Sequence, residues 1–128
     1  MRMTWLTDIH LDFLREPEIA QFLHEVSNCG GDALLITGDI GRSVSVAALL
    51  REMHGQLDIP IYFVLGNHDY YGGSISQTRS DVKEVADEMP GVFWLPNSGP
   101  VKLPPCTSLI GHGGWADGRL GDYENSSV

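Results

Sequence analysis

Six side chains able to bind a metal ion or transfer a proton fall in three short clusters, each directly after an apolar run. Carboxylate, imidazole and carboxamide groups are ligands for divalent cations, and imidazole also exchanges protons near neutral pH. The clusters therefore raise the question of a metal-dependent enzyme. The six residues are Asp8, His10, Asp39, Asn67, His68 and Asp69.

The first two clusters suit one metal ion. Asp8 and His10 flank Ile9, and alternate residues of an extended segment point the same way, so both could chelate a single divalent cation. Asp39 has two carboxylate oxygens and could bridge two ions. It follows Gly38, which permits a tight turn and a close approach of the backbone. We therefore predict metal ligation by Asp8, His10 and Asp39.

The third cluster, at 66–69, has two readings that the tetrapeptide alone leaves equal. A turn would explain it, since Gly and Asn tolerate unusual backbone angles and Asp caps helices. As a site, Asn67 offers a neutral oxygen to a second ion, while His68 contacts a phosphoryl oxygen or protonates the leaving group and Asp69 orients the imidazole. Two ions about 3.5–4 Å apart are a recurrent arrangement for phosphoester hydrolysis. We predict two divalent ions, with Mn, Fe and Zn as alternatives.

Alternating strands and helices are predicted to bring the clusters together. Continuous apolar strands separated by amphipathic helices indicate βαβ units, and hence an α/β fold with a covered parallel sheet. The carboxyl ends of parallel strands share one edge of the sheet, where ligands gather. Strands are predicted at 3–7, 33–37, 61–65, 92–95 and 107–111, and helices from Pro17 to the Cys29-Gly30-Gly31 stop, over 46–57 and over 74–89.

Composition narrows the class of protein. The chain has 128 residues, 42% of them apolar, so we predict a single globular domain over 1–128. The net charge of −9 disfavours non-specific binding to nucleic acid or anionic membranes. The first ten residues lack the apolar core of a signal peptide, no apolar run approaches membrane-spanning length, and Cys29 and Cys106 match no zinc or redox spacing. We expect a cytoplasmic protein with free thiols.

The ordered set D-x-H, G-D and G-N-H-D resembles the motifs of the calcineurin-like metallophosphoesterase superfamily. The resemblance implies an α/β/β/α sandwich of two sheets flanked by helices, with the site at the strand ends. It implies that Asp8, His10 and Asp39 bind the first metal, that Asn67 binds the second, and that His68 contacts the substrate phosphate. The activity implied is hydrolysis of phosphate mono- or diesters at a dinuclear metal centre.

The family pattern also contains later histidines that complete both metals, a lone ligand and then a G-H-x-H pair. Here the only later histidine is His112, and Gly114 stands where the second histidine of the pair belongs. The sequence therefore resembles the N-terminal half of the pattern, and we expect a partial sandwich. The alternative to an enzyme is a truncated or non-catalytic module that binds metal or acts by assembly.

An incomplete sandwich has consequences for its surface. Apolar strand faces and an open sheet edge in water drive association, so we expect the chain either to self-associate through the uncovered sheet or to represent the ordered part of a longer polypeptide. His112 is either a stand-in ligand or part of an ordinary loop, and Tyr70 and Tyr71 either line the substrate pocket or pack beneath the loop. Trp115 and Arg119 either close over the site as a lid or belong to a partner-facing end.

Overall fold

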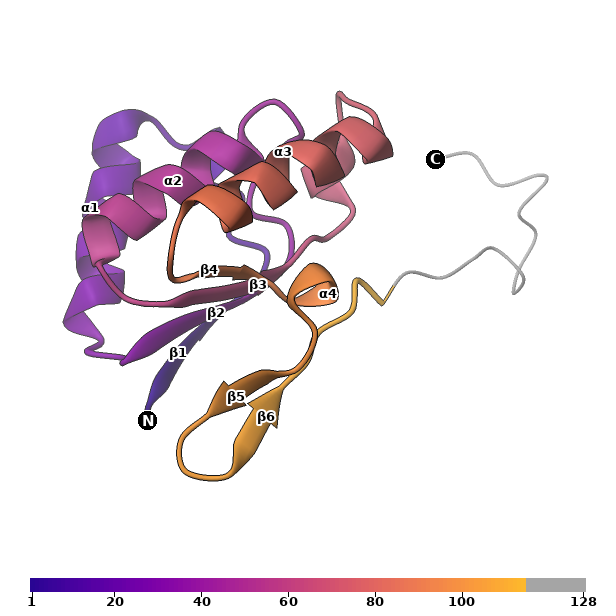
Figure 1. Ribbon diagram of the computed structural model, residues 1–128. Coiled ribbons are helices and arrows are strands. Elements are labelled where there is room, and N and C mark those ends of the chain that lie inside the picture. The colour runs from indigo at the N-terminus through magenta and orange to yellow at the C-terminus, as the bar shows by residue number, and fades with distance from the viewer. Residues whose placement is uncertain (115–128) are drawn as a thin grey trace, which may run out of the picture.

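Four parallel strands form the central sheet of the computed structural model, which describes residues 1–114 (Figure 1). Neighbouring strands pair in sequence order, so the parallel sheet and the α/β fold are confirmed. The strands are β1 (Met3–Leu6), β2 (Ala33–Thr37), β3 (Ile61–Val64) and β4 (Val92–Trp94).

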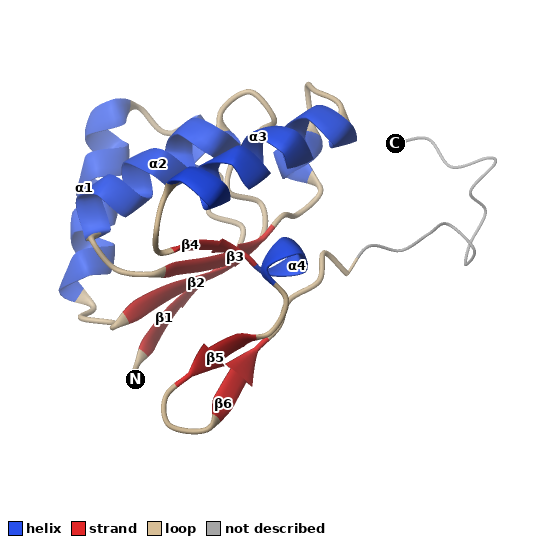
Figure 2. Cartoon of the chain, viewed as in Figure 1, coloured by secondary structure: helices blue, strands red, loops and turns tan. Residues whose placement is uncertain are grey.

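Three helices cover one face of this sheet (Figures 1 and 2). Because the crossovers between parallel neighbours run in one direction along the sheet and share one hand, they place every helix on the same side. The apolar residues of these helices, such as Leu49, Leu50 and Met53, belong to the same buried hydrophobic cluster as Leu34 and Phe63 of the sheet. The helices are α1 (Glu16–Asn28), α2 (Val46–Leu57) and α3 (Ile75–Glu88).

The opposite face of the sheet is covered less completely. The short helix α4 (Leu95–Ser98) leads into an antiparallel hairpin of β5 (Val101–Leu103) and β6 (Thr107–Leu109) on this side (Figure 2). A second small core gathers here around Ala33, Tyr62 and Leu95. Trp5 of β1 is 67% exposed.

The hairpin differs from the sequence prediction. The strand predicted at 107–111 exists as β6, but it pairs with β5 and not with the four-stranded sheet. β5 lies between two predicted strands, in a segment where the sequence predicted none, since three residues are too few to show a strand period. Self-association through the exposed part of the sheet stays a prediction.

The strand register brings the ends of β1, β2 and β3 side by side. Leu6 pairs with Ile36, and Thr37 pairs with Val64. The segments that follow these residues therefore leave the sheet at one edge. None of the helices within residues 1–114 is long and apolar enough to cross a membrane.

Candidate metal centre

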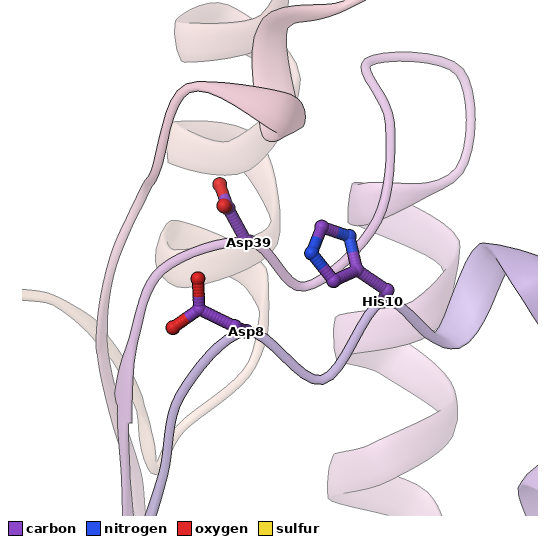
Figure 3. Close-up of side chains that lie close together, drawn as sticks. All are labelled: Asp8, His10 and Asp39. Atoms are coloured by element: carbon purple, nitrogen blue, oxygen red, sulfur yellow. The ribbon is translucent and has the colours of Figure 1, made fainter.

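Three of the four predicted metal ligands meet at this edge. Asp8 and His10 follow β1 and Asp39 follows β2, and one candidate ligand atom of each lies within 4.8 Å of the others. The side chains of Asp8 and His10 are directed toward the space beside Asp39 (Figure 3). Asp39 is buried whereas Asp8 is exposed, so the group is reachable from solvent. Two carboxylates and an imidazole form a donor set that suits a divalent transition metal.

The backbone at these three residues is left-handed. The φ angles are 52° at Asp8, 42° at His10 and 54° at Asp39. L residues rarely adopt this region, and such strain tends to cluster at functional sites. The fourth non-glycine residue with positive φ in the described chain, Asp58, ends α2, where a left-handed residue is ordinary.

This geometry corrects the reason given for pairing Asp8 with His10. The prediction assumed an extended segment, in which alternate side chains point the same way. The segment instead turns twice, and its backbone stays bonded to the loop after β2: Asp8 N–H donates to the Gly38 carbonyl at 3.1 Å and His10 N–H to the Asp39 carbonyl at 3.0 Å. The loop after β2 therefore holds both side chains in place.

Asp69 joins the loops that follow β2 and β3. It is fully buried, and its Oδ2 accepts the N–H groups of Asp39 at 2.9 Å and Gly66 at 2.8 Å. Its Oδ1 accepts those of Ile40 at 2.8 Å and Gly41 at 2.9 Å. These bonds correct the role predicted for Asp69: within the described residues no hydrogen bond links it to His68, and it positions backbone instead.

The pKa of the Asp69 carboxyl reflects this environment. Burial raises the pKa, and the negative charge of Asp39 adds to the rise, while the N–H groups of Gly41, Gly66 and Ile40 lower it. The net direction is upward. The hydrogen bonds therefore offset only part of the cost of burying this charge, and losing any of them would leave a buried polar group unpaired.

Gly38 and Gly66 allow the two loops to touch. A Cβ at Gly66 would lie 2.1 Å from Oδ1 of Asp39, and a Cβ at Gly38 would lie 2.8 Å from the Gly66 nitrogen. Gly38 also has a φ of 103°. A side chain at either position would clash with the other loop, which explains why G-D and G-N-H-D begin with glycine.

His68 lies beside Asp8, His10 and Asp39, a group called the triad below. It is part of the one-turn 3-10 helix η2 (His68–Tyr70). Its backbone N–H donates to Oδ1 of Asp39 at 3.0 Å. Its ring packs edge-on against the His10 ring, with centroids 4.7 Å apart, and also contacts the Tyr71 ring at 4.5 Å. Asn67 is exposed, and its side-chain N–H donates to the Tyr71 hydroxyl at 3.0 Å. That bond uses the amide nitrogen of Asn67 and leaves its carboxamide oxygen as the atom that could bind a metal.

The alternatives left open by the sequence resolve in part. His112 is exposed and its Nδ1 accepts the N–H of Gly114 at 3.0 Å; it lines a pocket together with Tyr70. Tyr71 contacts His68. Trp115 and Arg119, the predicted lid residues, lie outside the described residues.

Sequence reasoning missed three side chains that share this pocket with Tyr70 and His112. They are Arg79 of α3, Trp94 at the end of β4 and Asn97 of α4. The sequence places Arg79 only in the helix predicted at 74–89 and Trp94 only in the strand predicted at 92–95, because a pocket wall assembled from separate segments has no period along the chain.

The residues present fit a divalent cation. Nδ1 of His10 is buried and has no hydrogen-bond partner within the described residues. Buried polar atoms without a partner are rare in native proteins, and a metal or an ordered water is a usual explanation. Independently of that nitrogen, the imidazole of His10 beside the carboxylates of Asp8 and Asp39 is a donor set that a cation would complete.

Comparison with known proteins agrees with this geometry. The sequence model of the family described as calcineurin-like phosphoesterase matches residues 1–126. A search of curated proteins finds no match.

Proposed function

Since the chain belongs to the calcineurin-like phosphoesterase family, we propose that it hydrolyses phosphate mono- or diesters with two divalent metal ions. The observation that carries the proposal is the approach of Asp8, His10 and Asp39 to within 4.8 Å at the carboxyl ends of β1 and β2. Family membership supports phosphoesters as the substrate class. The acidic chain, with a net charge of −9, would repel a phosphoester unless cations were held at this edge.

Three residues would hold the first ion: Asp8, His10 and Asp39. Asp39 would bridge to a second ion, to which Asn67 contributes its carboxamide oxygen. When bound, divalent ions in such a pair polarise the phosphoryl oxygen and lower the pKa of water. Left-handed backbone and the bonds from Asp69 keep the first group in place before any ligand arrives, which reduces the reorganisation needed for binding.

His68 is the residue we assign to the leaving group. Its backbone is held by Asp39 and its ring by His10 and Tyr71, so the imidazole has a defined direction at the edge of the site. A half-buried imidazole can donate a proton to the departing alkoxide oxygen or a hydrogen bond to the phosphoryl group. Asp69 supports this indirectly, by fixing the loop from which His68 projects.

The test compares two aspartates with matched backbone strain. Asp8→Ala and Asp58→Ala both place alanine at a φ near 50°, but only Asp8 belongs to the candidate site. With Mn²⁺, we expect the unaltered chain and Asp58→Ala to hydrolyse 4-nitrophenyl phosphate or its bis ester. Asp8→Ala should bind little metal and hydrolyse neither. Equal activity in the two variants would exclude this site.

One observation favours a second candidate function, an assembly module that binds metal without catalysis. Within the described residues, no histidine from the later part of the chain joins Asp8, His10 and Asp39. His112 instead accepts a hydrogen bond from Gly114. Such a module would associate through the sheet face that exposes Trp5. Bound metal without hydrolysis, together with a dimer in light scattering that Trp5→Ser disrupts, would favour it.

A further inference from the structure

A pocket of about 440 Å³ opens beside the candidate metal centre. Leu65 and Tyr70 form part of its wall, and they flank the segment that carries Asn67 and His68. The pocket is completed by residues that follow β4 and by α3, so it lies at the carboxyl ends of β3 and β4. Its volume is in the range of sites for small organic ligands. A phosphoester bound at the triad could therefore extend its alcohol portion into this space.

Arg79 is the charged group of the pocket wall. Four other cations of the described chain form ion pairs with carboxylates, whereas Arg79 forms none there. Its Nε donates to the Tyr70 hydroxyl at 3.4 Å, a long hydrogen bond between partners that both line the pocket. In a chain of net charge −9, a guanidinium at a pocket that pairs with no carboxylate among residues 1–114 is available to an anionic ligand.

Trp94 contributes a second, independent feature. It is 8% exposed, and its indole Nε1 is buried with no hydrogen-bond partner within the described residues. Because this nitrogen is closed to solvent, the indole lines the pocket with its ring and not with its N–H. Leu65 and the rings of Trp94 and Tyr70 otherwise give the wall an apolar, aromatic character, which suits a planar group.

We propose that this pocket selects the alcohol portion of the substrate, and that it takes a planar ring carrying an anionic substituent that pairs with Arg79. The inference rests on the proposed phosphoesterase function and adds the substrate class. Trp94 and Tyr70 contact the ring, Arg79 contacts the anion, and the ester oxygen faces the segment that carries His68. Arg79 is in this sense a specificity residue.

Binding of the alcohol alone tests the pocket without using the metal centre. The matched probes are 3-hydroxybenzoate and 3-hydroxybenzamide, which have nearly the same shape and differ in charge. We expect the benzoate to bind the metal-free chain about tenfold more tightly, the contribution of one charge-assisted hydrogen bond. The indole N–H signal of Trp94 in ¹H–¹⁵N NMR should shift. The chain has three tryptophans, and the signal that is lost in Trp94→Phe belongs to Trp94. Alternatively, it is the signal that remains in both Trp5→Phe and Trp115→Phe.

The matched variants are Arg79→Gln and Lys83→Gln. Both remove one positive charge from α3, but Lys83 is paired with Asp87. Arg79→Gln should abolish the tenfold preference, and Lys83→Gln should retain it. Equal affinities of the two probes for the unaltered chain, or a Trp94 signal that does not move, would overturn the proposal.

Hydrolysis separates this proposal from the function on which it rests. With the phosphate monoesters of the same two alcohols, kcat/KM should favour the carboxylated ester about tenfold, and Arg79→Gln should remove the preference. Selective binding without hydrolysis of either ester would refute the phosphoesterase function and leave the pocket standing. Hydrolysis of both esters without a preference would refute the pocket and leave the function standing.

Discussion

The two halves of the candidate metal centre are built differently. The first position, formed by Asp8, His10 and Asp39, has its ligand atoms within 4.8 Å on left-handed backbone. The proposed second position is Asn67, which is exposed and directly precedes the one-turn helix that carries His68. The difference teaches that the backbone organises the first position in advance, whereas the second depends on side chains that solvent reaches.

From this contrast we expect one ion to be held better than the other. The first position has two carboxylates and an imidazole, while the second has a neutral carboxamide oxygen and the shared carboxylate of Asp39. Charge and pre-organisation both favour the first position. Calorimetric titration with Mn²⁺ should therefore show at most one tight site per chain.

The largest effect is expected from Asp39→Ala. It removes the carboxylate that we propose bridges the two ions, so metal affinity should fall by more than about 100-fold, beyond the usual cost of losing an outer-sphere partner. Mass-spectrometric metal analysis after desalting measures it. Retention of one ion per chain would show that Asp8 and His10 bind it without Asp39. The expected difference in affinity between the two positions would then not come from the carboxylate of Asp39.

His68→Ala should separate catalysis from binding. The backbone N–H that bonds Asp39 remains in this variant, so the first position should keep its metal. Turnover should fall by roughly 10²–10⁴, the range for a lost general acid. Metal analysis and hydrolysis are measured on the same preparation; a parallel loss of metal would make His68 a ligand.

Asp69→Asn tests what holds the first position. The asparagine side chain would turn an N–H₂ group toward backbone N–H donors, leaving buried groups unpaired. We expect the free energy of unfolding to fall by about 3 kcal/mol. Urea denaturation measures it, with Asp58→Asn as the control at an exposed aspartate. An unchanged midpoint would mean that the loops do not depend on this carboxylate.

The smallest effect is expected from Tyr71→Phe. It removes the hydroxyl that accepts from Asn67 while keeping the ring against His68. Affinity at the second position should weaken about 2–10-fold, as one hydrogen bond would predict, with the first position unaffected. Titration with Mn²⁺ resolves the two steps. A change in the tight site instead would show that the two positions are coupled through η2.

The sequence by itself determined the fold class and the edge at which chemistry is placed. Buried positions carry apolar residues, and in strands and helices these residues recur with a spacing that is visible in the sequence. Parallel pairing then requires that the segments after β1, β2 and β3 emerge together, so the convergence of Asp8, His10 and Asp39 followed from topology.

Only the tertiary structure decided how those residues are held. Three features each involve atoms from separate segments. They are the bonds that hold the left-handed turns at Asp8 and His10 to the loop after β2, the bonds that four backbone N–H groups donate to Asp69, and the pairing of β5 with β6. The meeting of Arg79 with Trp94 in one pocket wall likewise involves separate segments. Hydrogen bonds and pocket walls depend on distances between atoms, and folding sets these distances. Such contacts therefore leave no periodic pattern in the sequence.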